Sequence, residues 1–291
     1  MPWLINSTQL EKFRKNQKNV VILDASLHMD GRDAKAEFIE KHIIDAQFFD
    51  IKDFCDPHTD VPNMLLLDEK IISEKLGKLG IRNDYKIILY DNSKSYSACR
   101  ALWMFKVFGH NPQLLYILDG GFEAWERDGG KIDAGEPFFS SKTYNVQLQK
   151  QFISTLQDIK HNLGASTHQI IDVRHPVRFA GGPEPRPGLR QGHIPGSFCY
   201  PYFTLFNKDG TFITSEKLRK KCQELGIDLH APIITTCGSA LTAPILNFLL
   251  DLIQHEKHSV YDGSWSEWGA DRLFSGETSL DERPVESCVD V

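Results

Sequence analysis

The chain has 291 residues, of which 41% are hydrophobic and 25% charged, and its formal net charge is -6. This balance is typical of soluble globular proteins and argues against disorder over most of the chain. Neither a basic stripe nor a polybasic cluster stands out, so binding to nucleic acid or to an anionic membrane has no electrostatic basis. No apolar run of about 18 residues and no signal-like N-terminus occurs, and we expect a soluble, cytoplasmic protein with small-molecule or protein partners.

Four blocks of sequence recur in the same order, which indicates an internal duplication. A chain of this length is long for a single core, and each copy is expected to bury a core of its own. The matched pairs are 20–24 with 169–174, 40–47 with 191–197, 78–91 with 224–237, and 117–125 with 260–268.

Within each copy, short apolar strand patterns alternate with helical patterns. Residues 20–24 and 169–173 are typical of buried parallel strands, whereas residues 97–105 and 215–222 have a helical pattern. The alternation predicts an α/β fold of two tandem domains, each a mostly parallel sheet flanked by helices. The expected boundaries are a first domain at 1–132, a linker at 133–152, a second domain at 153–275, and a polar, loosely ordered tail at 276–291.

Cys237 is the candidate nucleophile. It follows the β-branched run of residues 232–236, and residues 242–250 beyond it predict a capped helix with Pro244 near its first turn. A cysteine between a buried strand and a helix N-terminus faces unpaired backbone N–H groups, which stabilise a thiolate. Because most free cysteines are simply small buried hydrophobes, it is this strand-turn-helix context that favours a function.

The other five cysteines are interpreted as core or surface thiols. No C-x-x-C pair and no dense spacing occurs, so we expect free thiols in a reducing compartment, without structural zinc, another metal or a cofactor. Aligning the two copies places Asp91 opposite Cys237, so the first copy carries an acid where the second carries the thiol. The first domain is therefore expected to shape a cleft rather than to perform the chemistry.

A second informative stretch is the loop at residues 174–190. It follows a strand, is too rich in proline and glycine to be helical, and carries four arginines. Rigidly held guanidinium groups can bind a carboxylate with paired hydrogen bonds, although pairing with nearby acids is the commoner role of any single arginine.

Several further motifs complete a pattern that covers nearly the whole chain. They lie at residues 31–34, 37–38, 48–51, 96–98, 118–121, 192–196 and 262–265. With them the chain resembles the two-domain sulfurtransferases, which are tandem rhodanese domains with an active-site cysteine in the C-terminal copy. Residues 237–242 read Cys-Gly-Ser-Ala-Leu-Thr and are similar to the 3-mercaptopyruvate branch, Cys-Gly-Ser-Gly-Val-Thr, rather than to the Cys-Arg-Lys-Gly of thiosulfate sulfurtransferases.

The resemblance implies a reaction and roles for the residues of this loop. Cys237 would take sulfur from 3-mercaptopyruvate as a persulfide, release pyruvate, and pass the sulfur to a thiol acceptor such as thioredoxin or to cyanide. Ser239 and the backbone N–H groups of the loop would hold the thiolate and persulfide anions. The remaining residues implied in substrate binding are Gly238, Ala240, Leu241, Thr242, Arg178 and Arg186; the spacing of the two arginines is one residue shorter than the family pattern.

One departure from the family concerns proton transfer. Related mercaptopyruvate enzymes carry a histidine before Met-Leu in the first domain, within a relay to an aspartate and the active-site serine. Here Asn63 occupies that place, and Asp53 is the nearest match for the aspartate. An asparagine cannot exchange a proton near neutral pH, so we expect a relay-free mechanism or a lower rate, unless His58 substitutes.

Three alternative functions compete with this reading of the loop. A phosphatase on this fold would need Cys-x5-Arg, and the sixth residue after Cys237 is Ala243, which excludes that chemistry. A thiosulfate:cyanide sulfurtransferase stays open. So does a non-catalytic persulfide carrier, although a carrier would not require the arginine loop.

Overall fold

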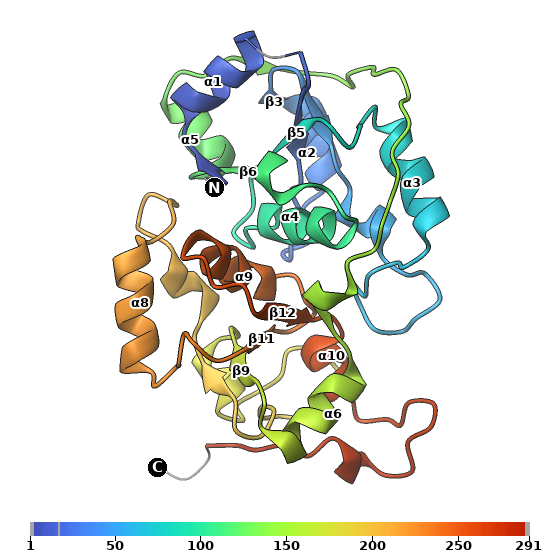
Figure 1. Cartoon of the computed structure of the whole chain (residues 1–291), viewed down its shortest axis with the longest axis vertical. Coiled ribbons are helices and arrows are strands. Elements are labelled where there is room, and N and C mark those ends of the chain that lie inside the picture. Colours follow the sequence, from blue (N-terminus) through green and yellow to red (C-terminus); the bar gives the residue numbers. More distant parts are fainter. Residues whose placement is uncertain (1–2, 17, 289–291) are drawn as a thin grey trace. The chain divides into compact units, whose positions relative to one another are not determined.

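The computed structural model describes residues 3–16 and 18–288, and the chain divides into two compact units (Figure 1). The first unit comprises the chain up to Asp56, Leu65–Lys150 and Phe206–Phe212. The second unit comprises Pro57–Met64, Gln151–Leu205 and the chain from Ile213 onward. A short segment of each sequence half thus belongs to the opposite unit, which the repeat pattern did not predict.

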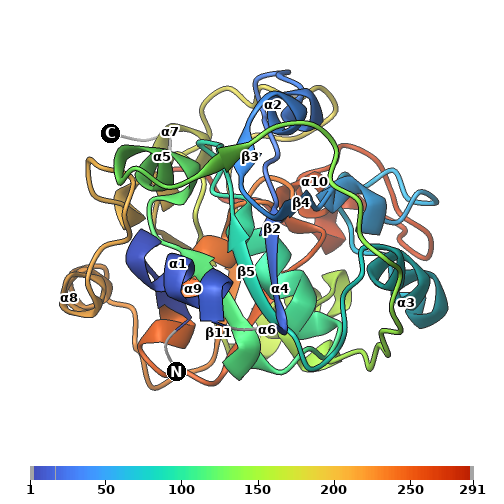
Figure 2. The same ribbon diagram turned by 90° about the horizontal axis from the view of Figure 1, so that it is seen from above.

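The first unit is built on a five-stranded parallel sheet in the order β1-β6-β5-β2-β4. β2 and β5, which run side by side (Figure 2), are the strands predicted from the apolar runs beginning at residues 20 and 86. The bounds are β1 (Leu4–Ile5), β2 (Val20–Asp24), β4 (Ala46–Phe48), β5 (Lys86–Tyr90) and β6 (Leu115–Leu118).

Helices cover both faces of this sheet. Leu10, Phe38 and Trp125 bring three helices onto one face, where they pack with alternate strand residues such as Ile88. The helix predicted at residues 97–105 packs against β5 and β6 from the opposite face, and all of its side chains are buried. The bounds are α1 (Ser7–Asn16), α2 (Ala34–Glu40), α5 (Gly121–Arg127), α3 (Glu69–Lys78) and α4 (Ala98–Val107), with short 3₁₀ helices η1 (Ile51–Phe54) and η2 (Pro112–Leu114).

The second unit repeats the same sheet, in the order β10-β9-β11-β12-β8, again with all strands parallel. β11, which precedes Cys237, takes the central place that β5 takes in the first unit. The predicted duplication and α/β fold are therefore confirmed. The strands are β8 (Ile153–Ser154), β9 (Gln169–Asp172), β10 (Phe198–Cys199), β11 (Ile233–Thr236) and β12 (His258–Tyr261). The helices are α6 (Leu156–Ala165), α7 (Pro176–Phe179), α8 (Ser215–Glu224), α9 (Ala243–Leu252) and α10 (Ser264–Trp268), with 3₁₀ helices η3 (Lys150–Phe152), η4 (Tyr202–Leu205) and η5 (Leu280–Glu282).

The predicted linker segment begins with a short strand, β7 (Ile132–Asp133), which pairs antiparallel with β3 (His42–Ile43). Beyond β7 it has no regular element up to η3. It is nonetheless held to the first unit, because Gln149 N donates to Val107 O at 2.7 Å and Tyr144 is buried.

The prediction of a loosely ordered tail after residue 275 is wrong for the described part, which ends at residue 288. The Arg283 side chain is fully buried and donates to Glu277 at 3.0 Å and to the carbonyl oxygens of Glu267, Trp268, Ala270 and Arg272. The backbone of Glu286 exchanges hydrogen bonds of 2.8 and 3.0 Å with that of His193. The tail is thus held to the second unit by the buried Arg283–Glu277 pair and by the backbone of Glu286, although other polar residues of the tail, such as Asp281, are exposed.

None of the helices in the described part of the chain combines the length and the apolar character that a membrane crossing requires.

Candidate active site

Cys237 directly follows β11 at the carboxyl end of the central strand, as predicted, and its side chain is buried. In parallel α/β sheets, this end of the strands carries the functional loops. α9 begins six residues later with Pro244 in its first turn, but Thr242 at its N-cap makes no side-chain cap hydrogen bond. The predicted strand-turn-helix is confirmed, whereas the side-chain cap is absent.

The loop that follows Cys237 presents unused hydrogen-bond donors. Within the described part of the chain, the backbone N–H groups of residues 238–242 donate no hydrogen bond, whereas the carbonyls of Cys237 and Gly238 accept from Trp265 N at 3.0 Å and Ser266 N at 2.8 Å. Free N–H groups at the start of a helix favour negative charge. The loop is thus anchored through its carbonyls and leaves its donors available to an anion.

Ala240 and Leu241 are buried within this loop, and Ala240 adopts a left-handed conformation with φ of 53°. Glycine adopts this conformation without steric cost, whereas a Cβ atom adds of the order of 1 kcal/mol. The branch that this loop resembles has glycine at this place, whereas this chain carries the strain of a Cβ atom.

Ser264 is a site residue that the sequence analysis missed. Its hydroxyl accepts from Cys237 N at 3.3 Å and lies 4.0 Å from Cys237 Sγ, and its backbone is left-handed with φ of 50°. The matched position in the first copy is Gly121, with φ of 58°. The available sequence signal was a serine at the place where the other copy has glycine. A side chain in this left-handed conformation is strained, and such strain is most often kept where the side chain has a function.

The guanidinium groups of the predicted arginines Arg178 and Arg186 both lie beside Gly238. The prediction that residues 174–190 contain no helix is wrong, because Arg178 lies on the short helix α7, where proline at the first position is compatible with a helix start. A Cβ atom added to Gly238 would lie 3.3 Å from Arg186 Nη2 and 3.5 Å from Arg178 Nη2. Arg186 also donates to Gly238 O at 3.0 Å and to Ser266 Oγ at 2.6 Å. Gly238 is therefore the residue that leaves room for two guanidinium groups beside Cys237, and a longer side chain would displace them.

Glu184 holds both arginines and was also missed. Its carboxylate, 3% exposed, accepts from Arg178 Nη2 at 2.7 Å and from Arg186 Nε at 3.4 Å, and it lies 3.8 Å from Arg174 Nη1. Burial lowers the pKa of Arg186, and the charges of Glu184 and Cys237 oppose this shift. A glutamate between two arginines on one rigid loop was the sequence signal for such a clamp.

We expect Glu184→Gln to raise the KM for an anionic substrate by about 10-fold and to change kcat much less, because the neutral amide holds the two guanidinium groups more weakly. Steady-state kinetics check this split, with exposed Glu216→Gln as the matched control. A purely structural role would instead lower the amount of active enzyme and leave KM unchanged.

Asn63 reaches the active-site loop from the segment Pro57–Met64 of the second unit. Its Nδ2 donates to Ser239 Oγ at 3.1 Å and to Ser239 O at 3.2 Å. A serine hydroxyl that accepts this bond keeps its own proton for donation to a ligand. Asp53, predicted as a possible relay partner, lies in η1 of the first unit, where it is exposed and 3.8 Å from Lys75 Nζ.

Three other thiols, two of them buried and that of Cys199 partly buried, are unsuited to act as thiolates. Burial raises the pKa of Cys199 and of Cys222 to about 11, and raises that of Cys99 well above its ordinary value. Cys288 is exposed. Among the described residues, no group of three or more His, Cys, Asp or Glu side chains is placed to hold a metal ion.

The first unit carries the expected acid at the matching position. Asp91 follows β5 and its side-chain oxygens accept from Ala98 N at 2.7 Å and Ser93 N at 3.2 Å. Its carbonyl accepts from Phe122 N at 3.0 Å, which mirrors the bond from Trp265 N to Cys237 O. Burial raises the pKa of Asp91 to about 7. The same scaffold therefore holds a hydrogen-bonded carboxyl here and a thiol in the second unit.

Comparison with known proteins agrees with this duplicated scaffold. The family model described as "Rhodanese-like domain" matches residues 7–128 and 155–271. The chain is 37% identical to the 3-mercaptopyruvate sulfurtransferase of Mus musculus, covering 88% of this chain and 87% of the relative. It is 35% identical to the thiosulfate sulfurtransferase of Cricetulus griseus, covering 85% and 84%.

The crystal structure of SseA, a 3-mercaptopyruvate sulfotransferase from Escherichia coli, superimposes with a TM-score of 0.83 at 29% identity, covering 91% of this chain and 99% of that one. Relatives of both names match over similar lengths. Overall sequence identity therefore does not distinguish between 3-mercaptopyruvate and thiosulfate as the sulfur donor. The geometry of the loop after Cys237 is the remaining basis for that distinction.

Proposed function

The chain belongs to the rhodanese-like domain family and is a sulfurtransferase, and we propose that its sulfur donor is 3-mercaptopyruvate. The observation that carries the proposal is the position of Arg178 and Arg186 over Gly238. Two adjacent guanidinium groups suit the carboxylate and keto oxygen of a 2-keto acid. An arginine at position 238, as in the thiosulfate branch, would need both of them to move.

In the proposed first step, the Cys237 thiolate attacks the sulfur of 3-mercaptopyruvate. A sulfur–sulfur bond forms, the carbon–sulfur bond breaks, and its electron pair passes to carbon as the enolate of pyruvate. The enolate then takes up the proton that the substrate thiol brought in, directly or through water. Arg178 and Arg186 hold the carboxylate and the oxygen on which negative charge develops.

In the second step, an acceptor thiolate or cyanide attacks the outer sulfur of the Cys237 persulfide and releases the Cys237 thiolate. The unused N–H groups of residues 238–242 stabilise the persulfide and thiolate anions between the two steps. The acceptor we propose is a small thiol or the dithiol of a thioredoxin-like protein.

Ser239 completes the site as a donor to the substrate. Because Asn63 donates to Ser239 Oγ, the Ser239 proton is directed away from Asn63 and toward the substrate oxygen. The pair can polarise the substrate without carrying a proton through the protein. We therefore propose a mechanism in which substrate and water, rather than a side-chain relay, move the proton.

The test compares the two sulfur donors with cyanide as the common acceptor. We expect kcat/KM for thiocyanate formation to be higher with 3-mercaptopyruvate than with thiosulfate, and we expect pyruvate to form in equal amount with the former. A clear preference for thiosulfate would overturn the donor. A Cys237 persulfide that forms but does not turn over with any acceptor would favour the carrier module instead.

We expect Arg178→Ala to raise the KM for 3-mercaptopyruvate by about 10- to 150-fold, which corresponds to the loss of about 1.5–3 kcal/mol of charge-assisted contact. Arg178→Lys keeps the charge but loses the planar pair of donors, so an intermediate value is expected. Steady-state kinetics of pyruvate release measure both. An unchanged KM in Arg178→Ala would mean that Arg178 pairs with Glu184 but does not contact the substrate.

We expect Asn63→His to raise kcat with 3-mercaptopyruvate by about 10-fold and to add a pH dependence near pH 6.5, because a histidine here can exchange a proton. The backbone at Asn63 is left-handed with φ of 62°, a conformation that histidine tolerates. pH–rate profiles check the effect, with thiosulfate as the internal control. A profile identical to that of the wild type would show that proton transfer does not limit the rate.

A further inference from the structure

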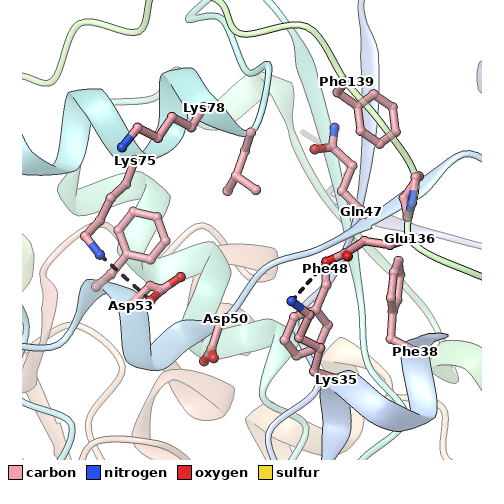
Figure 3. Close-up of a pocket in the computed structure, with 13 residues that line it drawn as sticks. Lys35, Phe38, Gln47, Phe48, Asp50, Asp53, Lys75, Lys78, Glu136 and Phe139 are labelled. Atoms are coloured by element: carbon pink, nitrogen blue, oxygen red, sulfur yellow. Dashed lines mark ion pairs between the residues drawn. The ribbon is translucent and has the colours of Figure 1, made fainter.

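The first unit contains a pocket of about 560 Å³ that residues of the same unit line (Figure 3). Two ion pairs lie in its wall, Lys35 with Glu136 at 2.9 Å and Lys75 with Asp53 at 3.8 Å. These charges are paired within the protein, so they specify no ligand. The hydrogen bonds beside Cys237, in the second unit, are more specific.

Ser266, on the short helix α10, joins the loop after Cys237 to one of the two arginines. The residue is 6% exposed, and its backbone N–H and its hydroxyl both donate to Gly238 O, each at 2.8 Å. The same hydroxyl accepts from Arg186 Nη1 at 2.6 Å, and Arg186 Nη2 donates to Gly238 O at 3.0 Å. Ser266, Gly238 and Arg186 thus form a closed set of hydrogen bonds.

The chemistry of these groups determines the direction of each bond. A guanidinium group only donates, so the Ser266 hydroxyl accepts from Arg186 and gives its single proton to Gly238 O. No proton of this hydroxyl is left for a substrate. Ser266 is therefore placed to act through Arg186 and the loop, and not on the reacting atoms.

Arg186 depends on these bonds more than Arg178 depends on any single contact. Arg178 donates to both oxygens of Glu184, through Nε at 3.1 Å and through Nη2 at 2.7 and 2.8 Å. Arg186 reaches Glu184 through Nε at the longer distance of 3.4 Å. Its shortest bond is the one to Ser266 Oγ. Without that hydroxyl, the Arg186 side chain, which is 32% exposed, would be free to adopt other rotamers.

The first copy of the duplicated scaffold lacks this hydroxyl bridge. The residue that matches Ser266 is the exposed Glu123, and Asn92 matches Gly238. In the part of the chain that the structure describes, no hydrogen bond joins Glu123 to Asn92. The shared fold therefore does not require the bridge, which occurs in the copy that carries Cys237 and the arginines.

We propose that Ser266 is a positioning residue for the sulfur donor. Its hydroxyl holds the guanidinium group of Arg186 against the loop, in the orientation that binds the oxygens of a 2-keto acid. This role rests on the proposed function, because it requires Arg186 to contact the donor. Loss of the hydroxyl weakens donor binding before any bond to sulfur changes, so Ser266 affects KM more than kcat.

Steady-state pyruvate release by the full chain tests this role. Ser266→Ala should raise the KM for 3-mercaptopyruvate by at least about 5-fold and lower kcat by less than about 2-fold, because one hydrogen bond to a charged group is lost. Ser266→Thr keeps a hydroxyl and should return the KM to within about 2-fold of the wild-type value. The matched control is Ser275→Ala, at an exposed position of the same unit, which should leave both constants unchanged.

A double-substitution cycle separates positioning from a general effect on packing. In an Arg186→Ala background, Ser266→Ala should change the KM by less than about 1.5-fold, because residues that act as one unit are not additive. Thermal unfolding verifies that each variant is folded. Equal effects of Ser266→Ala in the wild-type and Arg186→Ala backgrounds would overturn the proposal.

An unchanged KM in Ser266→Ala would also overturn it, and a fall in kcat at unchanged KM would assign Ser266 a structural role instead. The sulfur donor is judged separately, by the preference of the wild type between 3-mercaptopyruvate and thiosulfate. If thiosulfate is preferred while Ser266→Ala still raises the KM for 3-mercaptopyruvate only when Arg186 is present, the positioning role stands and the donor assignment is lost.

Discussion

Cys237→Ser is expected to lower pyruvate formation from 3-mercaptopyruvate by at least about 10³-fold, because the hydroxyl is a far weaker nucleophile than the thiolate and cannot form a persulfide. The fold of the loop should be kept, since Cys237 is held by its backbone bonds to Ser264 and Trp265. Pyruvate release under saturating donor and acceptor measures the effect.

A second measurement identifies the cysteine that receives the transferred sulfur atom. Wild-type protein incubated with donor and no acceptor should gain the mass of one sulfur atom on the peptide that contains Cys237, as read by mass spectrometry. Cys199→Ser is the control, because burial raises the pKa of Cys199 to about 11 and its thiolate is scarce at neutral pH. The nucleophile would be misassigned if Cys237→Ser kept its rate or if the added sulfur lay on another cysteine.

Arg283→Met is expected to destabilise the second unit by about 3–5 kcal/mol. The guanidinium group is fully buried, pairs with Glu277 at 3.0 Å, and donates to carbonyl oxygens of residues 267–272. Its loss leaves buried acceptors without donors and weakens the support of a buried carboxylate. Equilibrium unfolding in urea measures the change.

Arg272→Met is the matched control, because its ion pair with Asp60 lies on the surface of the same unit, where such pairs contribute about 0–1 kcal/mol. Equal destabilisation by the two substitutions would show that the tail is held by its backbone hydrogen bonds and not by Arg283.

The sequence predicted the structure correctly where the pattern involves residues close together in the chain. The apolar runs before Asp91 and Cys237 predicted the central strands, because burial on both faces of a parallel sheet selects β-branched and aliphatic residues. The duplication predicted a second, mostly parallel sheet, and the exchange of Asp91 for Cys237 identified the copy that carries the thiol. Ala243 excluded phosphatase chemistry from a single position.

Contacts between distant residues were not accessible in this way. Ser264 lies 27 residues after Cys237, and the loop at Asn63 lies 176 residues before Ser239, yet each forms a hydrogen bond at the site. The tail was misjudged because a polar sequence does not reveal whether its groups meet water or protein. Arg283 and Glu277 are buried together, and each satisfies the other.

By itself, the sequence determined the family of folds and the duplicated organisation and predicted the candidate nucleophile, since these depend on short-range periodicity and on one reactive residue type. Only the tertiary structure decided how the site is held. It showed that Glu184 clamps two arginines over Gly238, that Ser264 faces the thiol, and that Asn63 donates to Ser239. Side chains meet there because β11 and the loops of one sheet converge at its carboxyl end, and such convergence is a property of the folded chain.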